Sequence, residues 1–208
     1  MGLRDIVTID ANVNGQVVSG SYYAGEITWD WLAPVPSGFA PSITTYCVDI
    51  LHELTDPQTV NVSTTNDPAM TTPATDGGGK AAWLLNSFGG TVTTGIQAAA
   101  LQVAIWEALY DNTPNLATGS FKLLTTGVPY TTDAEAQAIF NQATSYLGQL
   151  FSSNAPNHLY YTSVAAWLDA TKTNGGGQDQ ITTPEPTSVA LLGMGALVAR
   201  FSRRRRQS

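Results

Sequence analysis

TGIQAAALQVAIWEALY (residues 94–110) has the strongest helical pattern in the chain. Thr94 and Gln97 stand three positions apart, the spacing of a capping box, so a helix is predicted from there to residue 110. Gln102 shares one face of this helix with three apolar residues: Ile105, Trp106 and Leu109. Burying an amide in such a face costs about 1–3 kcal/mol unless its polar atoms are hydrogen-bonded. We therefore expect this helix in the core, with a specific partner for Gln102.

Both helices and strands are predicted around this helix. A short helix over 80–88 precedes it, and a longer helix over 132–151 follows it, opened by a second capping box. Residues 6–51 are instead β-prone, with a hairpin turn at Asn14-Gly15 and strands over 21–29 and 42–50. The pattern predicts an α+β fold, in which a sandwich- or barrel-like sheet part holds an inserted helical part that carries the Gln102 helix.

The chain is predicted to contain one globular domain, residues 1–183, and a tail, residues 184–208. Thr and Gly fill the last ~12 residues of the domain, which predicts a linker, with a closing strand over 178–182 as the alternative. The domain has four basic residues against fifteen acidic ones, because five of the six arginines lie in the tail. A body of this charge repels phosphate backbones, which argues against a nucleic-acid partner.

The tail combines three signals in order. The sequence Pro184-Glu185-Pro186 is followed by an apolar run over 189–199 and then by an arginine cluster: Arg200, Arg203, Arg204, Arg205 and Arg206. The apolar run is shorter than the roughly 20 residues that span a bilayer, but the arginines can stay at the cytoplasmic surface. An amphipathic helix with a basic, lipid- or nucleic-acid-binding end is the alternative interpretation.

This tail resembles the PEP-CTERM sorting signal of Gram-negative bacteria, which exosortases recognise and process. The resemblance implies that Pro184, Glu185 and Pro186 mark the recognition motif and that the tail inserts transiently in the membrane before it is removed. It also implies export to the cell surface or extracellular matrix of a Gram-negative bacterium. Residues 1–10 contain no apolar signal segment, so we expect that this start is truncated or misassigned.

Cys47 is the single cysteine, so no intramolecular disulfide is possible. In an exported protein such a thiol oxidises unless it is buried or chemically occupied. A buried cysteine acting as a small apolar residue is the simpler interpretation.

However, the runs Tyr46-Cys47-Val48-Asp49 and Gln102-Val-Ala-Ile-Trp106 resemble, in the right order, two motifs of bacterial thioester domains. The resemblance covers roughly residues 21–111.

The thioester-domain resemblance implies a specific chemistry for the two motifs. Cys47 would attack the carboxamide of Gln102, expel ammonia and leave an internal thioester, with Tyr46 and Trp106 as sheltering aromatics. Asp49 would lie near the site as a hydrogen-bonding partner, or simply end a strand, and Ile105 would line the same helix face. A lysine-like amine on a cell surface or matrix partner would then form an isopeptide bond, as in an adhesin or biofilm protein. The chain would be a self-reacting binding module rather than a turnover enzyme.

Two other functions stay open at this point. A passive extracellular matrix protein would keep the fold without the thioester. A cysteine hydrolase would need a base, and the two histidines, His52 and His158, have no motif behind them. The run Gly77-Gly-Gly-Lys80 is followed by alanine instead of the Ser or Thr of a phosphate loop, and no His, Cys, Asp or Glu cluster has metal-ligand spacing. We therefore expect neither a cofactor nor a metal.

Overall fold

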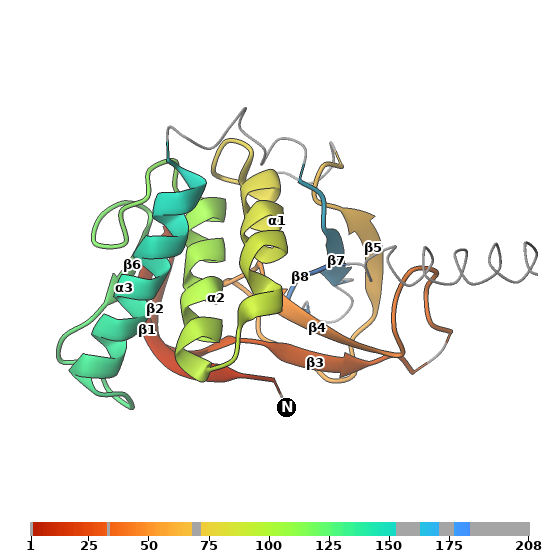
Figure 1. The fold of residues 1–208 in the computed structure, drawn as a ribbon, viewed down its shortest axis with the longest axis horizontal. Coiled ribbons are helices and arrows are strands. Elements are labelled where there is room, and N and C mark those ends of the chain that lie inside the picture. Colours follow the sequence, from red (N-terminus) through yellow and green to blue (C-terminus); the bar gives the residue numbers. More distant parts are fainter. Residues whose placement is uncertain (1, 33, 68–71, 153–162, 171–176, 184–208) are drawn as a thin grey trace, which may run out of the picture.

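The computed structural model describes residues 2–32, 34–67, 72–152, 163–170 and 177–183 (Figure 1). These residues form two antiparallel sheets and three α-helices, so the predicted α+β class is confirmed. The sorting motif, the apolar run and the arginine cluster of the tail lie outside the described residues. No helix within the described ranges is long and apolar enough to cross a membrane.

The first sheet is built on the predicted hairpin. Strands β1 (Arg4–Val13) and β2 (Gln16–Gly25) pair along their whole length, and β6 (Phe121–Leu124) adds to the free side of β1. The turn residues Asn14 and Gly15 have φ values of 53° and 85°. Asn and Gly adopt positive φ at low cost, which explains why the chain reverses there.

The second sheet has the order β3-β4-β8-β7-β5. Its strands are β3 (Ile27–Asp30), β4 (Ser42–Cys47), β5 (Val60–Thr64), β7 (Ala166–Ala170) and β8 (Gln180–Thr182). The shortest of them, β8, is the central strand, and all three of its residues are buried. The last residues before the tail are therefore a structural strand, so of the two expectations the closing strand over 178–182 is confirmed and the linker is wrong for this part; residues 171–176 lie outside the described ranges.

The single strand predicted over 21–29 is divided between the two sheets. The break falls at Gly25, which has a φ of 132°. A Cβ atom at this position would lie 2.5 Å from the carbonyl oxygen of Leu3, so only glycine fits. The chain therefore leaves the first sheet at Gly25 and enters the second sheet at Ile27.

The helices form one layer, with α2 between its two neighbours (Figure 1). They are α1 (Gly77–Phe88), α2 (Gly95–Tyr110) and α3 (Asp133–Leu150), close to the predicted ranges. Helix α1 begins three residues earlier than predicted, at glycines that pack closely against backbone: a Cβ on Gly78 would lie 2.6 Å from the Thr65 carbonyl oxygen. Since α2 also packs on the β1–β2 hairpin, every residue from Ala98 to Tyr110 is buried.

Candidate functional site

Cys47 and Gln102 meet in the core. Cys47 ends strand β4 and is 4% exposed, and Gln102 lies on α2 and is 1% exposed. The Cys47 backbone N–H donates to Gln102 Oε1 at 2.9 Å, and Gln102 Nε2 donates to the Cys47 carbonyl oxygen at 2.7 Å. The carboxamide of Gln102 is thus held against the cysteine by two hydrogen bonds.

The place for this carboxamide exists because strand β3 begins too late to pair with Cys47. On one side, the Val48 N–H donates to the Asp179 carbonyl oxygen, so the backbone polar groups of Cys47 point away from β8. On the other side, the pairing of β4 with β3 stops at Thr45, because β3 begins at Ile27 and the strand before it, β2, belongs to the first sheet. Gln102 therefore replaces the missing strand with a side-chain amide, which explains how a polar residue is accommodated in an apolar helix face.

The sulfur of Cys47 is held as a neutral thiol. Its S–H donates to the Asp49 carbonyl oxygen at 3.2 Å. Burial raises the pKa of Cys47 to about 12; the Asp49 backbone and the Trp106 side chain oppose this rise, and the negative charges of Asp49 and Asp179 add to it. A thiol with this pKa is almost entirely protonated at neutral pH, so nucleophilic attack needs help from neighbouring groups.

The other predicted site residues differ in their relation to the sulfur. Ile105 and Trp106 are buried on α2 in the same core cluster as Cys47, and the Trp106 side chain lowers the pKa of the thiol. Tyr46 is 1% exposed, but its side chain points to the face of β4 opposite to that of Cys47. Burial is the main cause that raises the pKa of Tyr46, and Glu26 and Tyr146 raise it further. Tyr46 therefore packs the core behind the site, and its expected role as a shelter at the sulfur has no support in this geometry.

Asp49 and His52 form a pair in the turn that follows β4. The distance between Asp49 Oδ2 and His52 Nδ1 is 2.5 Å, and Asp49 Oδ1 accepts a hydrogen bond from the Leu51 N–H at 2.9 Å. The strand expected to reach residue 50 ends at Cys47, so His52 lies in the turn. His52 thus orients the loop through Asp49, and the other histidine, His158, lies outside the described residues.

Tyr110 is a site residue that the sequence motifs did not identify. Its hydroxyl donates to the Val48 carbonyl oxygen at 2.9 Å and accepts from the Ile50 N–H at 3.3 Å. Tyr110 lies two helical turns beyond Gln102, so both side chains project from the same side of α2. The helix therefore holds the strand end at two points, and the i, i+8 spacing was the signal available in the sequence.

A second buried glutamine, Gln180, lies opposite Cys47 in the pairing of β4 with β8. Its Oε1 accepts from the indole N–H of Trp29 at 2.6 Å and from the hydroxyl of Thr45. Its Nε2 has no hydrogen-bond partner among the described residues. Nothing in the local sequence distinguished Gln180, because its neighbours come from strands more than 100 residues away.

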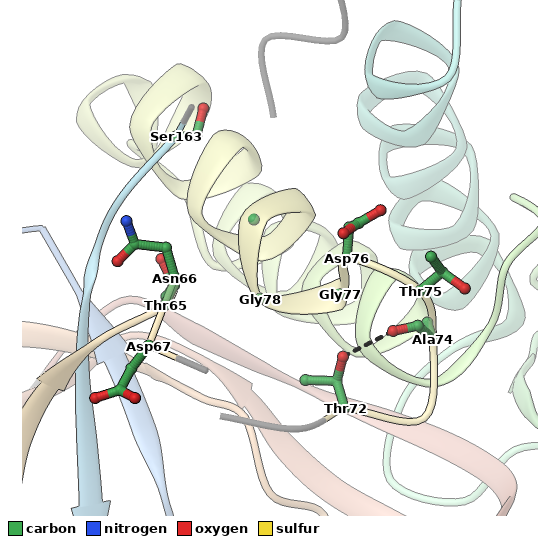
Figure 2. Close-up of a pocket in the computed structure, with 11 residues that line it drawn as sticks. Thr65, Asn66, Asp67, Thr72, Ala74, Thr75, Asp76, Gly77, Gly78 and Ser163 are labelled. Atoms are coloured by element: carbon green, nitrogen blue, oxygen red, sulfur yellow. Dashed lines mark hydrogen bonds between the residues drawn. The ribbon is translucent and has the colours of Figure 1, made fainter. Parts of the chain in front are cut away.

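A surface pocket of about 420 Å³ lies at the start of α1, and no residue of the Cys47 site lines it (Figure 2). Thr72 Oγ1 donates to the Ala74 carbonyl oxygen at 2.8 Å on its wall, and Asp67 and Asp76 place two carboxylates there. Across the part of the chain that the structure covers, no group of three His, Cys, Asp or Glu residues could hold a metal. The glycines of this wall form the first turn of α1.

Glu107 is a buried carboxyl group on α2, next to Trp106. Its Oε1 accepts from the Asn115 N–H at 2.8 Å, and its Oε2 has no partner among the described residues. Burial raises the pKa of Glu107 to about 8, the hydrogen bond from Asn115 lowers it, and the charge of Asp111 raises it further. The side chain is therefore mostly protonated at neutral pH.

The raised pKa of Glu107 predicts a loss of stability with rising pH. The contribution of the protonated group is fully present below its ordinary pKa of 4.5 and is lost as the pH rises through about 8. Glu107→Gln cannot ionise and keeps the acceptor for Asn115, so we expect it to gain stability relative to the wild type across this range. Urea unfolding at the two ends of the range measures this difference, and equal pH dependence in both proteins would contradict the assignment.

Comparison with known protein families identifies a PEP-CTERM protein-sorting motif over residues 182–206. The predicted tail signal is thereby confirmed. No curated protein and no solved structure matches the chain. The motif marks a bacterial protein that is exported, sorted to the cell surface or matrix, and processed by exosortase.

Proposed function

We propose that Cys47 and Gln102 form an internal thioester, and that the exported protein uses it to attach covalently to amine groups of a surface or matrix partner. The observation that carries this proposal is the pair of hydrogen bonds between the Gln102 carboxamide and the Cys47 backbone. These bonds hold the reacting carbonyl group against the residue that bears the nucleophile, and such positioning lowers the barrier to attack.

The proposed reaction is balanced without a cofactor. The Cys47 sulfur attacks Gln102 Cδ, the bond from Cδ to Nε2 breaks, and Nε2 leaves as ammonia with the thiol proton. Negative charge develops on Oε1 during the attack, where the Cys47 N–H already donates a hydrogen bond. An amine of the partner later attacks Cδ, the C–S bond breaks, and the sulfur takes up the amine proton. The products are an isopeptide bond to Gln102 and a free Cys47 thiol.

Burial and charge both fit a stored electrophile that reacts with amines. Cys47 and Gln102 are each less than 5% exposed, which keeps water from the thioester. The domain up to residue 183 has fifteen acidic residues and only four basic ones, and a negative body attracts cationic amines such as lysine side chains. A lysine-rich protein on a cell surface or in a biofilm matrix is the partner class that we propose.

A passive matrix protein is the second candidate, and one observation favours it. Both polar atoms of the Gln102 side chain are already satisfied, so the residue is stable in the core without any reaction. Loss of Nε2 as ammonia would leave the Cys47 carbonyl oxygen without this donor, at a cost of about 1–3 kcal/mol. A hydrolase is less well supported, since among the described residues the Cys47 S–H donates to the Asp49 carbonyl oxygen and is not hydrogen-bonded to His52, the base that a hydrolase would need.

The mass of the purified protein separates the candidates. The thioester predicts a mass lower than that of the sequence by one ammonia, resistance of Cys47 to alkylation, and addition of methylamine at Gln102. After methylamine treatment, Cys47 should become available to alkylating reagents under denaturing conditions. An unmodified mass together with an alkylatable Cys47 in the denatured protein would reject the thioester and leave the passive candidate.

A further inference from the structure

We propose that the indole N–H of Trp106 stabilises the negative charge on the Cys47 sulfur while the thioester forms and breaks. This inference rests on the proposed function and assigns Trp106 a chemical role in it. The role differs from shelter, because it depends on one polar hydrogen and not on the apolar ring. Trp106 would then be a catalytic residue of the self-reaction.

The first observation is that the Trp106 donor is unused. Trp106 is 3% exposed, and its Nε1 lies out of contact with solvent and without a hydrogen-bond partner among the described residues. A buried donor left unpaired costs about 1–3 kcal/mol, so an indole in a well-packed core normally finds an acceptor. The ring itself is fixed by packing on Phe121, with the ring centroids 5.9 Å apart.

The second observation is where this donor lies. Trp106 follows Gln102 by four residues, so the two side chains leave the same face of α2 one turn apart. Gln102 contacts the Cys47 backbone, and Trp106, one turn further along the same face, is buried in the same core cluster as Cys47 and favours the ionised form of its sulfur. One helix turn therefore presents both the acyl group and a hydrogen-bond donor to the cysteine.

The hydrogen bond that the thiol makes at rest is lost when the sulfur ionises, so the sulfur then needs a donor. In the resting state the S–H donates to the Asp49 carbonyl oxygen. Once the proton leaves, the same carbonyl oxygen faces a negative sulfur and can no longer stabilise it. The indole N–H can donate to this sulfur when it attacks Gln102, and again when the C–S bond breaks and the electron pair returns to it.

Two substitutions at position 106 test the role of the N–H. Trp106→Phe removes the donor and part of the ring, while benzothienylalanine at position 106 keeps the ring shape and lacks only the N–H. We expect both to slow ammonia loss after refolding, and methylamine capture, by about 10- to 100-fold, the effect of one hydrogen bond to a charged atom. Trp31→Phe is the matched control, since Trp31 Nε1 is also buried and unpartnered, and it should leave both rates unchanged.

The outcomes separate this inference from the thioester itself. Normal rates with benzothienylalanine would overturn it, even if Trp106→Phe were slow, because ring shape alone would then matter. The Gln102→Glu chain cannot lose ammonia and gives an independent readout, the alkylation rate of Cys47 at a fixed pH below its pKa. In that chain benzothienylalanine should lower the rate about tenfold by reducing the thiolate fraction. This readout decides the role of Trp106 even if the wild type never forms a thioester, and an unchanged rate would count against it.

Discussion

Cys47→Ala is expected to abolish both ammonia loss and methylamine capture while leaving the fold intact. Alanine removes the only sulfur that can attack Gln102, and the change is small because the side chain is short and buried. Both hydrogen bonds to Gln102 come from the backbone of residue 47, so the variant retains them. Intact mass before and after methylamine measures the effect, with far-ultraviolet circular dichroism as the check on folding.

Two glutamine variants locate the acyl group. Gln102→Glu keeps an acceptor for the Cys47 N–H but carries no amide nitrogen, so it should show no ammonia loss. Gln180→Glu is the matched control, because Gln180 is also buried, lies across from Cys47, and uses its Oε1 as an acceptor. We expect Gln180→Glu to retain the mass decrease. If Gln102→Glu kept the mass decrease and Gln180→Glu lost it, the acyl group would belong to Gln180 and not to Gln102.

Ile181→Asp is expected to unfold the domain. Ile181 has no exposed surface and lies in the central strand β8, where it pairs with Tyr46 on β4 and Trp167 on β7. An unpaired carboxylate there costs several kcal/mol, comparable with the whole stability of a typical domain. Circular dichroism and urea unfolding of the purified variant measure the loss.

Two milder substitutions serve as controls, which show whether the unfolding expected of Ile181→Asp comes from its place in β8. Ile181→Val keeps the strand and should cost about 0.5–1.5 kcal/mol. Thr183→Asp places the same carboxylate two residues later, at an exposed position, and should leave the urea midpoint near that of the wild type. A stable, folded Ile181→Asp protein would contradict the placement of β8 in the centre of the sheet.

Local patterns predicted those elements whose signals lie within a few residues. The capping box at Thr132 is present in the structure, with the Thr132 side chain and the Glu135 side chain each bonded to the other residue's backbone. The Asn14-Gly15 turn was predictable for the same reason, since both residues prefer the conformation that the hairpin needs. The helix that carries Gln102 followed from its apolar spacing and its threonine cap.

Features that depend on distant partners were not predictable in this way. The central position of β8 depends on pairing with β4, more than 100 residues earlier, and the Thr- and Gly-rich composition around it suggested a linker. The use of Gln102 as a substitute for a missing strand depends on where β3 begins. The two sequence motifs predicted that Cys47 and Gln102 meet. They could not show that the Tyr46 side chain points away from the Cys47 sulfur, or that Tyr110 binds the backbone that follows Cys47.

The position of β8 also determines how a pull on the C-terminal end of the domain would reach the fold. Only Thr183 separates the buried Thr182 from the proline that opens the sorting motif, so a pull on the C-terminal end acts on the middle of the sheet with almost no slack. Strands on both sides of β8 share that pull through their ladders. If a partner is joined to Gln102, the load passes from α2 through the packed interior to β8. The mechanical strength of such an attachment would then be set by the folded core between its two ends, not by the covalent bond.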